Sequence, residues 1–310
     1  MGSNKQTFNA TLIALSMLAF VQMNTHAASA NDEKKDPHQP HFHGLAKKIQ
    51  TDGKIVPTQF PVWAVIRELL PSTLISEPLL RPGLSPHTHD LKPSNAKVMT
   101  EGLAIVGVSQ QIDAWAKGED RIDWMDGLPH SFQIFLIKDT PDPHFWLDPL
   151  AVKSTLPFLV EKFCHLIAHH CDQIKKNQIV FEKQLDKINK NLRAQFKQIK
   201  KTSVALTHPF FIYFLKRYEI EVAFIVHDRP SGYLGPKRIQ KLIELTHKSQ
   251  PRLLLTPRQN PSAHTAAQAL IDATQMKLLE LDPIGASSTI TSYESLIRWN
   301  AQKLIQELSQ

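Results

Sequence analysis

The stretch Asp142-Pro-His-Phe-Trp-Leu-Asp-Pro149 decides how we interpret the 310-residue chain. Pro143 disfavours a helical conformation at Asp142, and Asp148-Pro149 is typical of a helix N-cap followed by the first helical residue. The apolar run from Leu150 to Ile167 then predicts a helix. His144 is expected on a short, stiff loop ahead of it, where an imidazole can act as a metal ligand or a base. A lone turn histidine is more often a packing residue, so the rest of the chain must decide between the two.

Residues 1–30 have the composition of a removable signal peptide. Lys5 supplies a positive start, residues 10–21 are apolar, and Ala28-Ser-Ala30 fits a small-x-small cleavage site. The apolar run is too short to span a bilayer as a stable helix. We therefore expect export and cleavage near Ala30, with a retained N-terminal anchor as the alternative.

Residues 31–53 are polar and predict a flexible arm. His38, His41 and His43 in this arm could bind a metal loosely or could simply be solvated. The formal net charge of the chain is +7, and its basic residues are densest between Lys175 and Lys201. No basic cluster is interleaved with aromatic residues, so we expect no nucleic-acid partner.

Two cysteines, Cys164 and Cys171, could pair in an exported protein. On one continuous helix their Cα atoms would lie ~10.5 Å apart, which exceeds the ~7 Å limit for a disulfide. A bridge therefore requires a helix break between them. The segment His169 to Asp172 could supply it, with Asp172 capping the next helix.

From Ile55 onward the pattern alternates between strands and helices, which favours parallel sheets covered by helices. In the first half we predict a strand over 73–80, a helix over 111–117 and an irregular segment over 120–129. Residues 172–201 carry the strongest helical periodicity, without Gly or Pro inside. This segment predicts a long helix that joins two lobes, and a coiled-coil dimer is the rival interpretation.

Three further loops match the opening one. His87 follows the first predicted strand region, His208 follows the predicted strand 203–207, and Asp282 follows the one ending at Leu281. Ligands of parallel sheets gather at the carboxyl ends of strands, and three imidazoles with one carboxylate suit zinc. The chain has no His-Glu-x-x-His motif, no Gly-x-Ser-x-Gly motif and no phosphate-binding glycine loop.

The four loops resemble the signature loops of metal-binding periplasmic solute-binding proteins of ABC transporters, with the zinc-binding ZnuA type the most similar. The matching stretches are 85–94, 142–149, 207–218 and 281–285. The resemblance implies two α/β lobes, each with a mostly parallel sheet flanked by helices, joined by one long rigid helix. It also implies a metal site with two ligands from each lobe: His87 and His144, then His208 and Asp282.

The chain departs from the family pattern in three places. It lacks the long His/Asp-rich loop between the first two ligands. It has Thr256-Pro-Arg-Gln259 where the family usually has Glu-Pro-Gln, and Pro-Phe-Phe after His208 where Asp-Ala-Phe is usual. These departures bear on affinity and on the transporter partner. His89 is a substitute ligand to consider, and His130 and His227 are either supporting or surface residues.

The expected organisation is a signal peptide (1–30), an arm (31–53), an N-terminal lobe (54–171), a linking helix (172–201) and a C-terminal lobe (202–310). We expect a monomeric periplasmic protein, not an enzyme, that binds Zn²⁺ as cargo and delivers it to an ABC permease in the inner membrane. Manganese or another divalent metal is the first alternative as cargo. A zinc-dependent hydrolase or a metal-dependent adhesin are further alternatives, although no loop places a Glu beside its ligand as general base.

Overall fold

The computed structural model describes residues 53–137, 139–227, 235–259 and 261–310. The predicted signal peptide, and His38, His41 and His43 of the predicted arm, lie outside these residues. Within the described ranges no helix is both long and apolar enough to cross a membrane.

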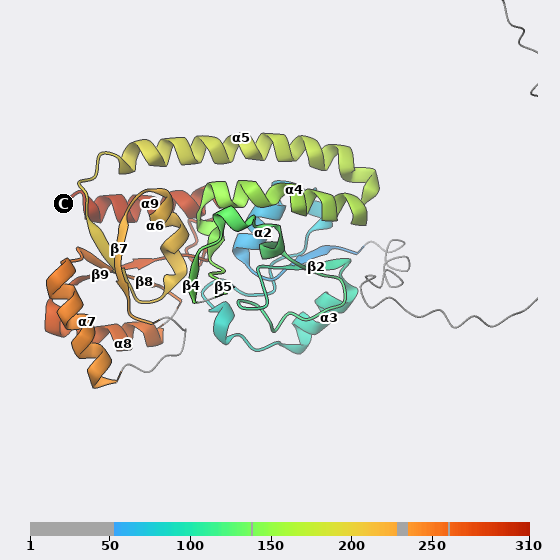
Figure 1. Cartoon of the computed structure of the whole chain (residues 1–310). Helices are drawn as coiled ribbons and strands as arrows, with labels where there is room; N and C mark the ends of the chain where they lie inside the picture. Colours follow the sequence, from blue (N-terminus) through green and yellow to red (C-terminus); the bar gives the residue numbers. More distant parts are fainter. Residues whose placement is uncertain (1–52, 138, 228–234, 260) are drawn as a thin grey trace, which may run out of the picture. The chain divides into compact units, whose positions relative to one another are not determined.

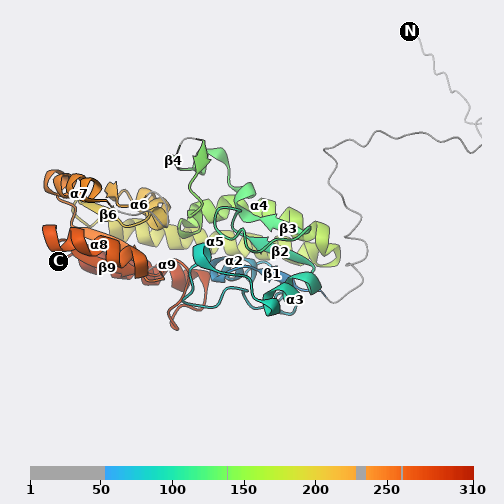
Figure 2. The same ribbon diagram turned by 90° about the horizontal axis from the view of Figure 1, so that it is seen from below.

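The first half of the described chain is built on a three-stranded parallel sheet in the order β1-β2-β3. Its strands are Ile55–Pro57, Ala104–Gly107 and Arg121–Asp123. The first two are buried along their whole length, as expected for a parallel sheet covered on both faces. Helices α2 (Phe60–Ile66), α3 (Pro93–Glu101) and α4 (Pro149–Leu166) accompany it, and β4 (Phe135–Ile137) pairs with β5 (Thr140–Pro141) in an antiparallel hairpin (Figures 1 and 2).

Three predictions for this half are wrong. The expected strand over 73–80 is irregular. The N–H groups of Ser76 and Leu79, three residues apart, donate to Ile55 O and Pro57 O, which are two residues apart on β1, so the segment does not pair with β1 in regular register. Only Ile75 forms a bridge. The expected helix over 111–117 consists of turns, because the Asp113 carboxylate accepts hydrogen bonds from the backbone N–H groups of Val108 and Ser109.

The third wrong prediction is that 120–129 is irregular, since this segment contains strand β3. Arg121 on this strand donates to the Asp113 carboxylate and pairs with Asp123. Its guanidinium is nearly buried. Burying it without these carboxylates would be costly, so the ion pairs with Asp113, eight positions away, and with Asp123 fix this strand.

Helices α4 and α5 (Cys171–Phe196) are joined by a short turn and a disulfide. The 3-10 helix η6 (Ala168–His170) separates them, and it brings the Cα atoms of Cys164 and Cys171 to 4.7 Å. The break therefore begins at Ile167, slightly before the expected one. Helix α5 ends at Phe196, five residues before the predicted end of the linking helix.

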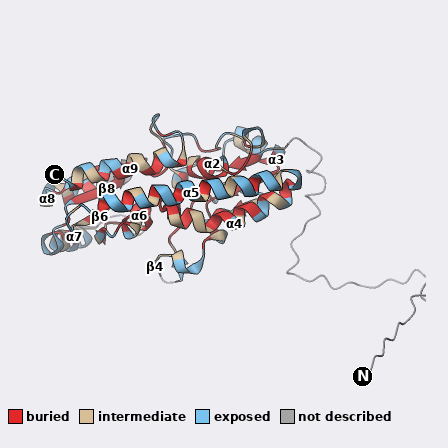
Figure 3. Ribbon diagram, turned by 90° about the horizontal axis from the view of Figure 1, so that it is seen from above, coloured by how far each residue is buried: buried red, intermediate tan, exposed pale blue. Residues whose placement is uncertain are grey.

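Helix α5 presents one buried stripe and one exposed face. Its buried residues recur at steps of three, four or seven residues: Ile174, Phe181, Leu185, Ile188, Leu192 and Phe196. The stripe contacts both α4, in the first half of the chain, and α9 (Tyr293–Leu308), in the last. Figure 3 shows the exposed residues along the opposite side of α5. This amphipathic pattern is why the helix lies across elements of both halves.

The second half of the described chain holds a four-stranded parallel sheet in the order β7-β6-β8-β9. Its strands in chain order are Ser203–Leu206 (β6), Glu221–Ile225 (β7), Leu253–Pro257 (β8) and Lys277–Leu281 (β9). Its helices are α6 (Ile212–Arg217), α7 (Pro236–Ser249), α8 (Pro261–Thr274) and α9. The remaining 3-10 helices of the described chain are Ser72–Leu74, Pro86–Thr88, Trp124–Gly127, His130–Phe132, Phe145–Leu147 and Pro209–Phe211. The predicted α/β class, with mostly parallel sheets flanked by helices in two lobes, is confirmed.

The opening stretch lies where the two halves meet. The Asp148 side chain accepts from Leu150 N and caps α4, as expected, and it also pairs with Arg217 of α6 at 2.8 Å. The Trp146 indole donates to Pro283 O at 2.8 Å, and the Tyr293 hydroxyl donates to Trp146 O at 2.9 Å. Trp146 and Tyr293 belong to one hydrophobic core that runs through both halves. The loop that carries His144 is therefore fixed from both sides.

Candidate metal centre

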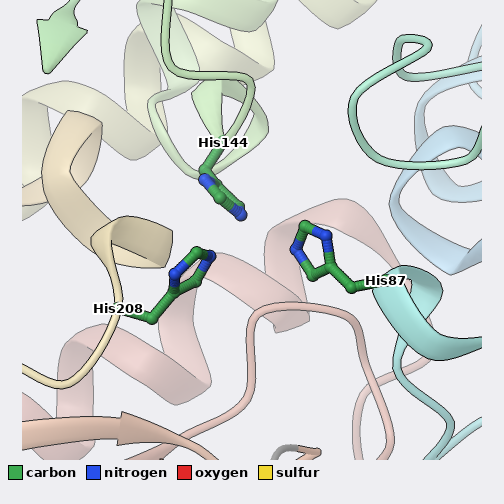
Figure 4. Close-up of side chains that lie close together, drawn as sticks. All are labelled: His87, His144 and His208. Atoms are coloured by element: carbon green, nitrogen blue, oxygen red, sulfur yellow. The ribbon is translucent and has the colours of Figure 1, made fainter. Parts of the chain in front are cut away.

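Three histidines from three separate segments converge on one point. His87 lies in the 3-10 helix Pro86–Thr88, His144 directly precedes the one at Phe145–Leu147, and His208 follows β6. Figure 4 shows their rings facing a common centre. The ring centroids are 5.0 Å apart for His144 and His208, 5.5 Å for His87 and His208, and 5.8 Å for His87 and His144.

The spacing of the ring nitrogens is close to that of a zinc shell. One ring nitrogen from each histidine lies within 4.8 Å of the other two. Zinc–nitrogen bonds of ~2.05 Å at tetrahedral angles place nitrogens ~3.3 Å apart. An inward movement of the three side chains would bring the nitrogens to this spacing and supply three of the four ligands. Among the described residues this is the only cluster of three or more His, Cys, Asp or Glu side chains with this geometry.

His87, His144 and His208 line two cavities, one of about 30 Å³ and one of about 180 Å³. A cavity needs roughly 10–15 Å³ to hold one water molecule, so the smaller of the two has room for a single ion. Both ring nitrogens of His208 are buried without a partner in the described chain. An unpaired buried polar group costs about 1–3 kcal/mol, and an ion held by His208 would relieve that cost.

The tautomer of His144 is fixed by Asp142. The His144 Nδ1 atom lies 3.0 Å from Oδ1 of Asp142. An ionised carboxylate only accepts hydrogen bonds, so Nδ1 carries the proton and Nε2 keeps its lone pair. Asp142 also accepts from the backbone N–H of His144, and its own carbonyl accepts from the Tyr213 hydroxyl at 2.9 Å. Nε2 is therefore available to an ion.

We expect Asp142→Asn to lower zinc affinity by about 10–100-fold, because carboxylates that orient a ligating histidine contribute that much. Isothermal titration of the metal-stripped protein measures the change. Asp186→Asn is the matched control, since Asp186 forms an ion pair with Lys153 on the exposed surface. An unchanged affinity in Asp142→Asn would contradict the role assigned to this carboxylate.

Burial keeps two of the imidazoles neutral. Burial, with a smaller contribution from His144, lowers the pKa of His87 to about 4. Burial also lowers the pKa of His208 well below its usual range, with added contributions from His144, His87 and His227. Only a neutral imidazole can ligate a metal, so both rings are in the binding form at neutral pH.

These lowered pKa values predict a pH-dependent stability of the metal-free protein. Between pH 6.5 and about 4, His87 is protonated in the unfolded chain and neutral in the folded one. The unfolded state then binds more protons, so the free energy of unfolding falls as pH falls through this window. Urea unfolding at several pH values measures the slope. His87→Gln should make the slope shallower, and an identical slope would contradict the prediction.

Asp282 lies at the carboxyl end of β9, as expected, but outside the histidine cluster. It is fully buried. Its Oδ1 accepts from Gln259 Nε2 at 2.6 Å and from Ala286 N at 3.0 Å, and its Oδ2 accepts from Ser287 N at 2.8 Å. A carboxylate has about four lone-pair sites, so one site on Oδ2 is left. The structure thus brings together three of the four expected ligands and places the fourth in an adjoining loop.

The other histidines lie apart from this cluster. His89 packs its ring against Trp115 at 4.5 Å, and the Trp115 indole donates to Pro86 O, which steadies the His87 segment. His130 is exposed and contacts Phe135. His227 is buried, and its backbone N–H donates to Thr207 O beside His208; it is therefore not a surface residue.

Sequence reasoning missed Gln259. This side chain is buried, lines the cavity with the three histidines and bonds Asp282. The rule that ligands gather at carboxyl strand ends applies to β8 as well as to β6 and β9. Applied to the residue that follows Pro257 and Arg258, it would have drawn attention to this position.

Residues 55–307 match the model of a protein family described as ZnuA, zinc-uptake complex component A, periplasmic. A protein of Thermotoga maritima, provisionally named as metal-binding, is 29% identical over 261 residues, which are 82% of this chain and 91% of that protein. The high-affinity zinc uptake system protein ZnuA of Yersinia pestis is 19% identical over 284 residues, covering 80% of this chain and 88% of that protein.

The fold is also found among solved structures. The periplasmic zinc-binding protein TroA of Treponema pallidum superimposes with a TM-score of 0.72 at 15% sequence identity, covering 83% of this chain and all of that one. At this identity the likeness concerns the fold. It agrees with the two parallel sheets and the long helix α5 described above.

Proposed function

This chain belongs to the ZnuA family of periplasmic zinc-uptake components, and on that premise we propose that it captures Zn²⁺ and delivers it to the permease of an ABC transporter. Proteins of this family are metal-binding transport components and not enzymes. The chain is therefore a transport protein for a divalent metal. The choice of zinc and the transfer to a permease are the proposal.

The observation that carries the proposal is the convergence of His87, His144 and His208 on a cavity that fits one ion. We assign these three imidazoles as nitrogen ligands. Asp282 is the proposed fourth ligand, through the free lone pair of Oδ2. A modest shift of its loop toward the histidines would be required. Its charge would partly neutralise the ion.

Zinc is favoured over manganese by the chemistry of the donors. Imidazole suits zinc, whereas manganese prefers oxygen-rich shells with more ligands. Three nitrogens and one carboxylate form a nitrogen-rich set. General affinity order also favours zinc at such sites, so the proposal concerns the ratio of the two affinities and not tight zinc binding alone.

The proposal includes export and cleavage near Ala30, and a monomeric mature protein.

A growth experiment tests delivery of the metal to the permease. Deleting the gene in the organism that encodes it should raise the zinc requirement under chelation. The wild-type gene should restore growth, whereas a His144→Ala, His208→Ala gene should not. If added manganese and not zinc rescued the deletion strain, the zinc assignment would fail.

A further inference from the structure

Gln259 occupies a position between two proposed ligands. Strand β8 lies between β6 and β9 in the sheet. His208, Gln259 and Asp282 follow the carboxyl ends of these three neighbouring strands. Gln259 is 8% exposed, and it lines the 30 Å³ cavity together with the histidines. The middle strand thus places a carboxamide at the edge of the ion site.

The orientation of this carboxamide is fixed by Asp282. The atom 2.6 Å from Oδ1 of Asp282 must be the Gln259 amide nitrogen, because a carboxylate oxygen accepts and a flipped amide would set two oxygens against each other. Oε1 is therefore on the other side of the amide. It is buried and has no hydrogen-bond partner within the described part of the chain.

A buried amide oxygen without a donor is unfavourable. The other unpaired polar groups at this cavity are the two ring nitrogens of His208. A single cation in the cavity would satisfy both residues, since an amide oxygen and a neutral imidazole are each metal ligands. A water molecule with its two O–H donors is the alternative occupant, and the test below distinguishes it from an ion.

We propose that Oε1 of Gln259 contacts the bound ion and is an additional oxygen ligand beside the three imidazoles. The inference rests on the proposed function, in which this cavity holds a divalent metal. A carbonyl-type oxygen is a hard, neutral ligand that suits manganese better than zinc. Gln259 therefore raises manganese affinity more than zinc affinity and narrows the gap between the two ions.

Gln259 could instead act only by holding Asp282 in place. Asp282 keeps other contacts that do not need Gln259. Its carboxylate accepts from Ala286 N and Ser287 N, and its backbone exchanges two hydrogen bonds with the Asn300 side chain on α9. The two roles can be separated by a double-mutant cycle, because an effect exerted through the Asp282 carboxylate disappears when that carboxylate is removed.

The test uses Gln259→Met, which keeps the side-chain length and removes both amide atoms. We expect manganese affinity of the stripped mature protein to fall by about tenfold, with a smaller fall for zinc. The same loss should appear when Gln259→Met is made in an Asp282→Asn background. Bound Co²⁺ should absorb more strongly in Gln259→Met than in wild type, as a lower coordination number requires.

Gln268→Met is the matched control, because Gln268 also donates to a carboxylate, Asp272, but on the exposed surface. Thermal unfolding without metal checks that each variant folds. If Gln259→Met does not fold, Gln259→Asn, which withdraws the oxygen by one methylene, should show the same losses.

The outcomes separate the two proposals. If wild type binds no metal, the proposed function fails. If wild type binds metal but Gln259→Met has the same affinity and Co²⁺ absorption, Oε1 contacts only water. The inference then fails, and the proposed function stands. The inference also fails if the effect of Gln259→Met vanishes in the Asp282→Asn background, since Gln259 then acts only on that carboxylate.

Discussion

Replacing His144 by alanine is expected to lower zinc affinity by more than about 100-fold, because it removes a ligand where the loss of a supporting residue already costs 10–100-fold. His87→Ala and His208→Ala should have effects of the same order, since each imidazole comes from a separate segment and none has a substitute within the cluster. Asp282→Ala should also weaken binding, because it removes the proposed carboxylate ligand. Titration of the stripped mature protein, with a competing chelator, measures each affinity.

Two controls accompany these variants. His247→Ala changes an exposed histidine on α7, far in the sequence from any proposed ligand. Removing His38, His41 and His43 together tests the predicted arm. Neither change should affect tight binding. If loss of the arm histidines costs as much affinity as loss of His144, the ligand assignment is wrong.

The second large effect is expected from His208→Glu. It replaces an imidazole with a carboxylate in a buried position that faces His87 and His144. Carboxylate oxygen suits manganese better than imidazole does. We expect the ratio of zinc to manganese affinity to fall by at least about tenfold, or about 1.4 kcal/mol, mostly through weaker zinc binding. Competition titrations with both ions measure the ratio.

The control for this variant is His247→Glu, which adds the same charge on the surface of α7. It should leave the ratio unchanged, because an exposed charge is screened by salt. A His208→Glu protein with the wild-type ratio would show that this position does not set the preference between the two ions.

Much of the fold could be predicted because its signals are local. Asp148 and Pro149 start α4 through an N-cap contact that involves Leu150, two residues away. The apolar spacing along 172–201 predicts α5, although the helix stops at Phe196. The two cysteines could pair only with a helix break between them, and the structure has both the break and the disulfide.

The features that could not be predicted depend on contacts that no local sequence pattern reveals. Arg121 fixes β3 by pairing with Asp113, a residue that also prevents a helix in its own segment. The Trp146 indole bonds Pro283 O across 137 positions, a contact that no local pattern predicts. Gln259 stood out only as part of a departure from the family pattern, and its importance comes from its contact with Asp282, 23 positions away.

In the candidate site, too, the sequence could predict some features and not others. The residue types and the loop positions of His87, His144 and His208 could be read from the sequence, and the structure brings them together. The environment of Asp282 could not be read from the sequence. Three hydrogen-bond donors fix its carboxylate, and one of them, Gln259, follows the end of another strand.

The most direct test of the central claim is direct competition of zinc and manganese for the stripped mature protein, followed by native mass spectrometry. The three-histidine cavity predicts one zinc ion per chain, with manganese displaced, and no bound zinc in a variant that lacks His87, His144 and His208. Manganese held as tightly as zinc would contradict the zinc assignment. One zinc ion retained by the triple variant would contradict the site itself.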